Sequence, residues 1–537
     1  MYLQFDPHQY PYSSRREIVY ARNGMVCTSQ TLAAQAGLDM LKQGGNAVDA
    51  ALAAAISLIV LEPTSNGLGS DAFALVWIKG VLYGLNGSGY APAAMSRETL
   101  LERGISAMPA RGWAPVTVPG APAAWEELHR RFGRLPFEKL FEPALNYAEH
   151  GYAVMPTLAE LWKESEQTFA KFRNDPAFAG LFPTFFSKGS APRAGEIVTL
   201  PWQARALRQI AASHSRDFYE GDIADAIDAF SQATGGYIRK QDLMEYKPQW
   251  VDPISTNYRG YDVWEIPPNG HGLVVLMAMA IARGLEFKER DTVDTFHKQI
   301  EAMKLAFTDG RKYIADPRYM RTKLSYWLSE EYAAQRRAQI RTQALMPAPV
   351  DPNCGGTVYL CAADREGNMV SYIQSNFMGF GSGIVVPEYG IALNNRGYNF
   401  SMEAASDNCV APRKKPYHTI IPGFLTKDGV PVGPFGVMGG FMQPQGHMQV
   451  LMNTIDFHMN PQAALDAPRW QWLGNKQIEI EPTVSQDIIR GLRDRGHTII
   501  INPDRNSYGR GQIIWRNEQG VLMGATEPRA DGAVAAW

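Results

Sequence analysis

The stretch that decides the fold is NCGGTVYLCAADREGNMVSYIQSN, residues 353–376. Its two apolar runs, 358–364 and 369–375, have the alternating pattern that is typical of strands. Between them lies Arg365-Glu-Gly-Asn368, whose Gly and Asn favour a tight turn. The sequence therefore predicts an antiparallel pair of strands, with Thr357 at its head directly after Gly355-Gly356.

Thr357 has the surroundings of a nucleophile that the chain exposes by cutting itself. Its hydroxyl could attack the carbonyl of Gly356, which carries no side chain to block the approach, and water would then hydrolyse the resulting ester. The freed α-amine, with an ordinary pKa of about 7.7–8.0, would serve as the base for the hydroxyl of the same residue. The alternative is an ordinary β-branched residue that opens a strand.

The first ninety residues predict two helices and a hairpin. Apolar residues at helical spacing in 31–63 are interrupted by Gly44-Gly45, which suits the end of a helix, and Asn46 suits the start of the next one. The run 70–90 alternates on either side of Lys79-Gly80 and predicts two strands joined there.

The rest of the chain changes character at a Pro-rich link, residues 346–353. Before this link, residues 118–332 are predicted to be mostly helical, with a loop-rich part at 174–195. After it come short strands with turn signals and one long helix, 446–458, behind Gly439-Gly440. Strands packed between helical layers predict an α+β sandwich.

Several motifs recur in one known family. Beyond Thr357, the chain has Asp364-Arg-Glu-Gly-Asn368, Phe380-Gly-Ser-Gly383 and Gly390-Ile-Ala-Leu-Asn-Asn395 in the order and spacing of the small-subunit start of the γ-glutamyltranspeptidase family, which it strongly resembles. That family belongs to the N-terminal-nucleophile hydrolases. The resemblance covers nearly the whole chain, through the motifs GGNAVDAALAAA (44–55), VPGAPAAW (118–125), EPALNYAEHGY (142–152), YEGDIADAI (219–227), EAMKLAFTD (301–309), DAPR (466–469) and EPR (527–529).

The resemblance implies a four-layer αββα sandwich with two stacked antiparallel sheets. It also implies autocleavage between Gly356 and Thr357, which would leave a large fragment, 1–356, and a small fragment, 357–537, in one catalytic unit. Ser375 stands where the family has a hydroxyl bonded to the nucleophile. Gly439-Gly440 match the pair whose N–H groups form the oxyanion hole, an interaction often worth several kcal/mol. A simple turn into a helix is the alternative for this Gly pair.

The substrate pocket departs from the family pattern. The family has Arg, Asn, Gln, Asp and Ser-Ser where this chain has Ser88, Phe377, Arg396, Asn399 and His418-Thr419. Each missing charged contact would cost about 1.5–3 kcal/mol, which argues against a γ-glutamyl group. Arg396 instead brings a cation suited to a carboxylate, and Phe377 and His418 would narrow the pocket.

This pattern resembles the oxamate amidohydrolases of bacterial purine and urate breakdown. We therefore predict hydrolysis of oxamate to oxalate and ammonia, with Arg396, aided by His418, on the carboxylate. The open alternatives are an Arg396 turned into a surface ion pair, a γ-glutamyl hydrolase or transpeptidase acting on glutathione-like substrates, and an acylase of the cephalosporin type. An uncleaved binding protein is a further alternative.

The composition and the N-terminal sequence limit which partners, cofactors and cellular locations are expected. The formal net charge is −2 with no long basic run, so nucleic acid is not expected as a partner, and Arg413-Lys-Lys415 is interpreted as a solvated turn. The four cysteines have no metal-ligand spacing, and we expect neither a metal site nor a cofactor. The N-terminus lacks a secretory pattern and no apolar run spans a membrane, so a soluble, cytoplasmic protein is expected. A dimer of two fragment pairs stays open.

Overall fold

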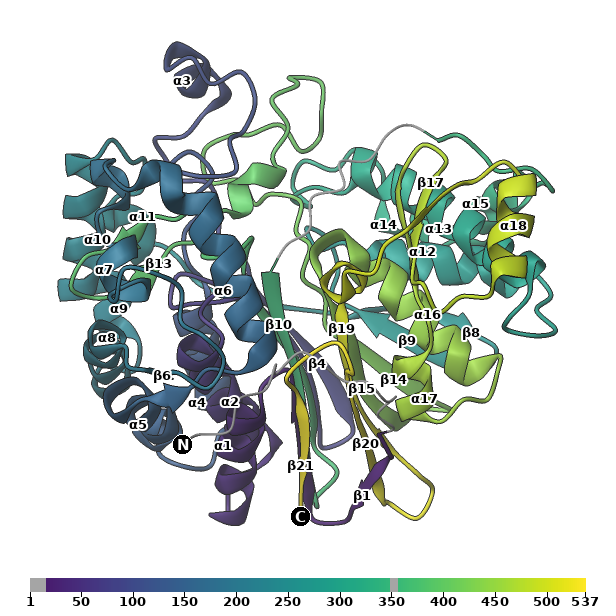
Figure 1. Cartoon of the computed structure of the whole chain (residues 1–537), viewed down its shortest axis with the longest axis horizontal. Coiled ribbons are helices and arrows are strands. Elements are labelled where there is room, and N and C mark those ends of the chain that lie inside the picture. Colours follow the sequence, from purple (N-terminus) through teal and green to yellow (C-terminus); the bar gives the residue numbers. More distant parts are fainter. Residues whose placement is uncertain (1–15, 348–355) are drawn as a thin grey trace, which may run out of the picture.

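The computed structural model describes residues 16–347 and 356–537, and the expected boundary at 346–353 lies largely outside these residues. Two large sheets stand side by side in the middle of the molecule, and helices cover the outer side of each (Figure 1). Both sheets have seven strands, and all their strand pairs are antiparallel.

The first sheet contains the strand that begins at the predicted cleavage point. Its strands, in spatial order, are β21 (Ala533–Ala536), β2 (Gly24–Thr28), β10 (Gly356–Asp364), β11 (Met369–Phe377), β3 (Asp71–Ile78), β4 (Val81–Gly87) and β7 (Gln249–Val251).

The second sheet faces the first. Its strands, in spatial order, are β1 (Val19–Ala21), β20 (Leu522–Thr526), β19 (Arg510–Arg516), β15 (Val430–Met438), β14 (Gly423–Lys427), β9 (Tyr261–Glu265) and β8 (Ile254–Tyr258). Three small sheets complete the strands: β5 (Tyr152–Ala153) with β6 (Ile197–Val198), β12 (Val385–Val386) with β13 (Ile391–Ala392), and β16 (Trp470–Gly474) with β17 (Gln477–Ile480) and β18 (Thr498–Ile501).

The helices form two groups, one on each outer face (Figure 1). Over the first sheet lie helices of the N-terminal half, which are α1 (Thr31–Lys42), α2 (Ala47–Leu61), α4 (Ala121–Phe132), α5 (Glu142–His150), α6 (Pro156–Phe169), α7 (Leu181–Phe185), α8 (Pro201–Ala212), α9 (Arg216–Glu220), α10 (Asp222–Ala233) and α11 (Lys240–Met244). The short helix α3 (Arg97–Glu102) lies apart from them, at the top edge of the molecule in Figure 1. Over the second lie α12 (Gly272–Arg283), α13 (Val293–Tyr313), α14 (Leu324–Trp327), α15 (Glu330–Arg337), α16 (Gln443–Ile455), α17 (Pro461–Asp466) and α18 (Gln486–Asp494).

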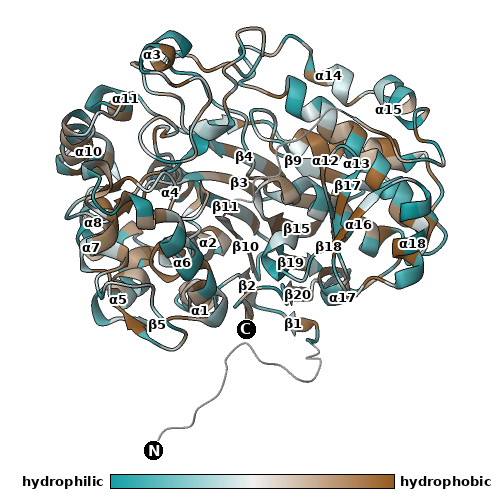
Figure 2. Ribbon diagram, turned by 45° about the horizontal axis from the view of Figure 1, so that its top comes forward, coloured by the Kyte–Doolittle hydropathy of each residue, from teal (hydrophilic) through white to brown (hydrophobic). Residues whose placement is uncertain are grey.

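Strand alternation divides the core into layers. On β10, Val358 and Leu360 pack with the N-terminal helices, whereas Tyr359 and Cys361 face the other sheet, because successive strand residues point to opposite faces. Gly436 on β15 permits this close approach, since a Cβ there would lie 2.4 Å from the Tyr359 ring. Hydrophobic residues gather where helices meet the sheets, and outer helices such as α15 are hydrophilic (Figure 2).

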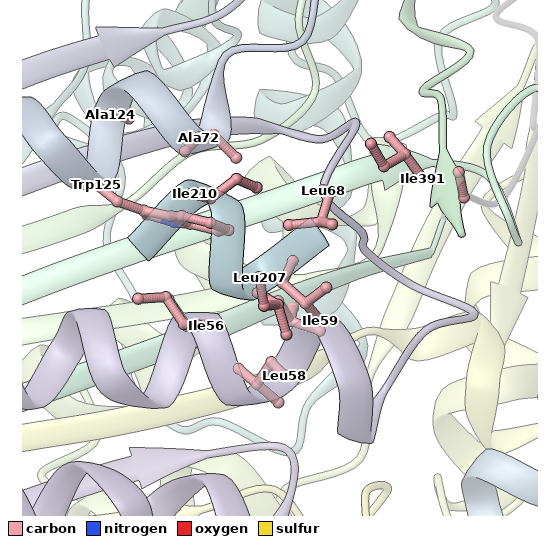
Figure 3. Packing of buried hydrophobic residues seen from close by; sticks show 14 of the residues in the cluster. Ile56, Leu58, Ile59, Leu68, Ala72, Ala124, Trp125, Leu207, Ile210 and Ile391 are labelled. Atoms are coloured by element: carbon pink, nitrogen blue, oxygen red, sulfur yellow. The ribbon is translucent and has the colours of Figure 1, made fainter. Parts of the chain in front are cut away.

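Helix α2 is the centre of the first helical layer, because every one of its residues is buried. Its side chains Ile56 and Ile59 lie close to Leu207 and Ile210 of α8, under Trp125 of α4 (Figure 3). This continuous apolar layer holds the outer face of the first sheet in place.

The predicted N-terminal elements are confirmed. Gly44 has a φ of +94° just after α1, which suits a glycine beyond a helix end. Asn46 caps the N-terminus of α2: its side chain accepts from the N–H groups of Val48 and Asp49, and the Asp49 carboxylate accepts from the N–H of Asn46. Lys79 and Gly80, with φ of +50° and +82°, turn β3 into β4.

The expectation of a mostly helical region at 118–332 missed three strands of the large sheets. β8 and β9 form a hairpin around Arg259 and Gly260, whose φ values are +50° and +86°. Its pattern of alternation around a Gly turn is the one that revealed the hairpin at Lys79-Gly80. Among the described residues, no helix is both long and apolar enough to cross a membrane.

Candidate active site

Thr357 lies fully buried at the start of β10 and makes a hydrogen bond to the neighbouring strand. Its Oγ1 donates to Ser375 Oγ at 3.0 Å, and the backbone N–H of Phe377 donates to the same oxygen at 2.7 Å. The antiparallel register, in which Gly356 lies opposite Phe377, brings these groups together. Ser375 thus holds the Thr357 hydroxyl in a fixed direction.

Phe377 ends β11 in an unusual conformation, with a φ of +80°. Non-glycine residues rarely adopt this region, and such strain concentrates at functional sites. Its buried ring lies under the guanidinium of Arg396, 4.7 Å from the ring centroid, and 6.2 Å from the ring of Tyr398. The aromatic side chain therefore forms one wall of the Arg396 environment.

Arg396 is fully buried on the short helix η4 (Arg396–Asn399), so the alternative of a surface ion pair is excluded. Its Nε donates to Asp71 Oδ2 at 3.1 Å and its Nη1 to Thr419 Oγ1 at 2.6 Å. Its Nη2 has no hydrogen-bond partner among the described residues. Burial lowers the pKa of Arg396 to about 10, against the opposing effect of Asp71, so the side chain stays charged near neutral pH.

Asp71 joins the site residues, although the sequence reasoning missed it. It opens β3 opposite Ser375, and its carboxylate also accepts a hydrogen bond from the N–H of Gly89 at 3.0 Å and contacts His418 Nε2 at 2.9 Å. Burial alone would raise the pKa of this carboxyl, but His418 and Arg396 hold it below the ordinary value. The sequence contained one signal for this role: Asp71 is a single charged residue at the start of the otherwise apolar strand β3.

His418, which is expected to help Arg396 hold the substrate carboxylate, is neutral near pH 7, and its role at that carboxylate stays a prediction. Burial, with a further effect of Arg396, lowers its pKa to about 4, so the imidazole is neutral near pH 7. Its Nε2 bonds to Asp71, and the N–H of Ile420 donates to its Nδ1 at 3.4 Å. His418 therefore orients Asp71.

Ser88 belongs to a buried hydrogen-bond network of amide side chains. It is next in sequence to Gly89, whose N–H donates to Asp71, the partner of Arg396. Its Oγ donates to Asn86 Oδ1 at 2.6 Å, and Lys415 Nζ lies 3.4 Å from that oxygen. The interpretation of residues 413–415 as a solvated turn was wrong for the lysines, which are both buried. Burial lowers the pKa of Lys415 to about 8, and its ammonium also donates to Gln249 Oε1 at 3.0 Å.

Asn399 closes η4 at the wall of a large cleft. Its backbone carbonyl accepts from Asn408 Nδ2 at 2.6 Å, while its own Nδ2 is buried and has no partner in the part of the chain that the structure describes. The cleft has a volume of about 990 Å³, and Arg311, Tyr398 and Phe441 also line it. Such a volume suits a drug-sized ligand.

Gly439 and Gly440 form the turn between β15 and α16, with φ of +139° and +57°. A Cβ on Gly439 would lie 2.9 Å from Gly509 Cα, so this backbone requires glycine. Helix α16 begins directly after the short helix η5 (Gly440–Met442), and its N-terminal end favours negative charge. These features suit both an oxyanion hole and a helix-entry turn.

His297, Glu301 and His497 lie close enough together to share a metal ion, which the sequence reasoning did not foresee. The His and Glu are one turn apart on α13, a spacing that was readable. Lys304 Nζ lies 2.7 Å from Glu301 Oε1 and 3.3 Å from His497 Nδ1. An ammonium therefore already supplies the positive charge that this group needs.

Known proteins match the chain along almost its entire length. The sequence model of the family described as Gamma-glutamyltranspeptidase matches residues 33–537. A glutathione hydrolase-like YwrD proenzyme of Bacillus subtilis is 34% identical, over 95% of this chain and 97% of its own. An oxamate amidohydrolase proenzyme of Klebsiella pneumoniae is 31% identical, over 96% and 98%.

A solved structure is similar in both sequence and fold. The crystal structure of a cephalosporin acylase from Bacillus halodurans has 59% sequence identity and a TM-score of 0.97, covering 100% of this chain and 99% of its own. The chain belongs to the γ-glutamyltranspeptidase family, and it is an autoprocessed hydrolase of amide bonds that acts through an N-terminal threonine.

Proposed function

We propose that the chain, once cut between Gly356 and Thr357, hydrolyses amides whose acyl part carries a carboxylate. The observation that supports this is a pair of buried donors on the short helix η4, Arg396 Nη2 and Asn399 Nδ2, which have no hydrogen-bond partner within residues 16–347 and 356–537. Buried donors without partners destabilise the protein, and a ligand with acceptor oxygens would remove this cost by accepting their hydrogen bonds. A substrate ammonium, as in a γ-glutamyl group, would find no negative charge in these two side chains, because Asn399 is neutral and Arg396 is a cation.

The chemistry follows from groups of the chain alone. The Thr357 hydroxyl attacks the amide carbon and passes its proton to the α-amine of the same residue, which then protonates the leaving amine. Ser375 orients the hydroxyl through its 3.0 Å hydrogen bond. The N–H groups of Gly439 and Gly440 stabilise the tetrahedral oxyanion, and water hydrolyses the threonyl ester to release the acid.

Oxamate is the smallest amide whose acyl part carries a carboxylate, and we propose it as one specific substrate. The 31% identical oxamate amidohydrolase proenzyme and the bulk of Phe377 beside Arg396 support it. Asp71 already neutralises part of the Arg396 charge, so a carboxylate would bind mainly through directed hydrogen bonds to the free Nη2.

A second candidate is an acyl-amide with a large amine, such as an acylated cephalosporin. The cleft of about 990 Å³ is far larger than oxamate requires, and the cephalosporin acylase structure with 59% identity supports this reading. The two candidates share the carboxylate-bearing acyl group and differ in the size of the amine. We also propose that the two sheets and their helices form the αββα sandwich; the cytoplasmic location and a dimer of fragment pairs stay predictions.

Matched substrates test the proposal with purified, cleaved enzyme. Glutaryl anilide and γ-glutamyl anilide differ only in the α-ammonium, so we expect kcat/KM to favour the glutaryl compound, with ammonia release from oxamate measured in parallel. Arg396→Gln should lower kcat/KM for glutaryl anilide about ten- to hundred-fold, while a denaturing gel checks its cleavage. A preference for γ-glutamyl anilide that survives in the variant would refute the proposal.

A further inference from the structure

Two motifs of the sequence, DAPR (466–469) and EPR (527–529), meet in one buried ionic network. Arg469 and Glu527 are both buried, and Arg469 Nη2 donates to Glu527 Oε2 at 2.8 Å. Arg529 Nη1 donates to the other carboxylate oxygen, Oε1, at 2.6 Å. The proposed mechanism uses neither motif, although both lie in the small fragment that begins with the nucleophile.

Glu527 is held as a carboxylate between the two guanidinium groups. Burial alone would raise the pKa of this carboxyl, but Arg469 and Arg529 hold it below the ordinary value. Its Oε2 also accepts a hydrogen bond from the N–H of Gly511 in β19, at 2.7 Å. Arg529 has a second carboxylate partner, Glu481, at 2.6 Å. Two carboxylates therefore balance two guanidinium groups, as buried charges require.

Arg469 fixes the backbone that leads into β19. Its Nη1 donates to the carbonyl of Tyr508 at 2.9 Å and to that of Gly509 at 3.0 Å. The backbone of Arg469 is itself held, because its N–H donates to Glu481 Oε2 at 2.7 Å and its carbonyl accepts from the N–H of Glu481 at 3.1 Å. One planar guanidinium thus joins two loop carbonyls to Glu527, a geometry for which arginine is suited.

The loop that Arg469 holds packs directly against the turn that begins at Gly439. A Cβ on Gly439 would lie 2.9 Å from Gly509 Cα, and a Cβ on Gly509 would lie 2.6 Å from the carbonyl oxygen of Met438. Met438 also pairs with Arg510 in the ladder of β15 and β19. Backbone meets backbone here, with no side chain between them to absorb a shift. A displacement of the loop is therefore passed to the turn.

We infer that Arg469 is a positioning residue for amide hydrolysis: through Gly509 it keeps the Gly439-Gly440 turn in the geometry that binds the oxyanion. This role rests on the proposed function, which assigns oxyanion binding to that turn. Glu527 contributes by holding both Arg469 and the N–H of Gly511. A misplacement of about 1 Å in such a site can slow a reaction about hundred-fold. Because the oxyanion exists only in the transition state, the loss should fall on kcat and leave KM nearly unchanged.

Arg469→Gln and Arg337→Gln compare two guanidinium groups that each donate to two backbone carbonyls. Arg337, on the outer helix α15, donates to the carbonyls of Ile281 at 2.9 Å and Ala280 at 3.1 Å. The substrate for all variants is whichever of glutaryl anilide, γ-glutamyl anilide and oxamate the wild type cleaves fastest, so acyl specificity does not enter the test. Per cleaved molecule, Arg469→Gln should lower kcat about ten- to hundred-fold with KM within about threefold. Arg337→Gln should keep both within about threefold, while urea unfolding reports the stability of each variant.

A second pair of variants decides the matter if Arg469→Gln does not fold or does not cut itself. Glu527→Gln removes the charge but keeps an acceptor oxygen, and should lower kcat several-fold. Glu301→Gln, the same change in the fully buried pair with Lys304, should not. Gly439→Ala separates the two levels of the proposal, because wild-type turnover in this variant would refute the oxyanion assignment itself. If Gly439→Ala loses activity while the Arg469 and Glu527 variants keep the wild-type kcat, the positioning role is overturned. An equal loss of kcat in the two control variants would overturn it as well.

Discussion

Removal of the Ser375 hydroxyl should slow both self-cleavage and turnover. In Ser375→Ala, Thr357 Oγ1 loses its 3.0 Å hydrogen bond and the N–H of Phe377 loses its 2.7 Å acceptor. As its proton leaves, Thr357 Oγ1 changes from a donor into a negatively charged acceptor, to which the Ser375 hydroxyl then donates, and a hydrogen bond to a charged group is worth about 1.5–3 kcal/mol. This converts to a decrease of about ten- to hundred-fold in each rate. The N–H of Phe377, which is left without an acceptor, should also lower the free energy of unfolding by about 1–3 kcal/mol.

Ser371→Ala is the matched control for this variant. Ser371 is another buried serine of β11, and its hydroxyl makes a 2.8 Å hydrogen bond to the Tyr359 hydroxyl, away from Thr357. Its removal should cost a similar free energy of unfolding, about 1–3 kcal/mol, and leave cleavage intact.

The assay follows the loss of the uncut chain on denaturing gels, and then measures amide turnover per cleaved molecule. Urea unfolding of each protein gives the stability change. Equal slowing of cleavage in Ser375→Ala and Ser371→Ala would refute the reasoning, because general destabilisation would then explain both. Unchanged rates in Ser375→Ala would refute it as well.

Four other outcomes are expected. Thr357→Ala should run as one band of the full chain on a denaturing gel, and two bands would place the nucleophile elsewhere. Asn399→Asp should move the kcat/KM preference from glutaryl towards γ-glutamyl anilide, because it replaces a neutral amide with a carboxylate that can pair with the ammonium. Gly439→Ala, strained at a φ of +139°, should lose about 1–3 kcal/mol of stability and most activity, as urea unfolding and turnover would report. The pKa of His418, about 4, lies below the ordinary value, so the free energy of unfolding should fall as pH drops below about 6.5, by about 2 kcal/mol at pH 5; the His418→Asn variant should lose less on acidification in urea titrations.

Local signals made much of the fold predictable. Strand alternation on both sides of residues 365–368 gave the β10–β11 hairpin, and the Asn46 cap gave the start of α2. These features depend on neighbours in sequence, which a single chain displays. The three missed strands in 249–265 are short. β7 and β9 gain stability from pairing with the distant strands β4 and β14, whereas β8 pairs with its neighbour β9 in a hairpin whose alternation is visible in the sequence.

The candidate site was predictable as a set of residues but not as a network. The family pattern brought Thr357 and Ser375 together, and the structure places them in contact. The pairing of Arg396 with Asp71 joins residues 325 positions apart, and no local rule reveals it. That pairing changes the interpretation of Arg396, because a carboxylate ligand meets a cation that is already partly balanced.

The strand order has a consequence for the life of the enzyme after the proposed cut. In the first sheet, β2 of the large fragment lies between β21 and β10 of the small one, and the second sheet also mixes strands of both. Neither fragment alone contains a complete sheet, so folding must be finished before the chain is cut. The fold of the mature enzyme would then have formed while the two fragments were still covalently joined. After denaturation the separate fragments could not refold into the two mixed sheets. Activation would be a one-way step: the cut enzyme retains its shape only as long as it is never unfolded.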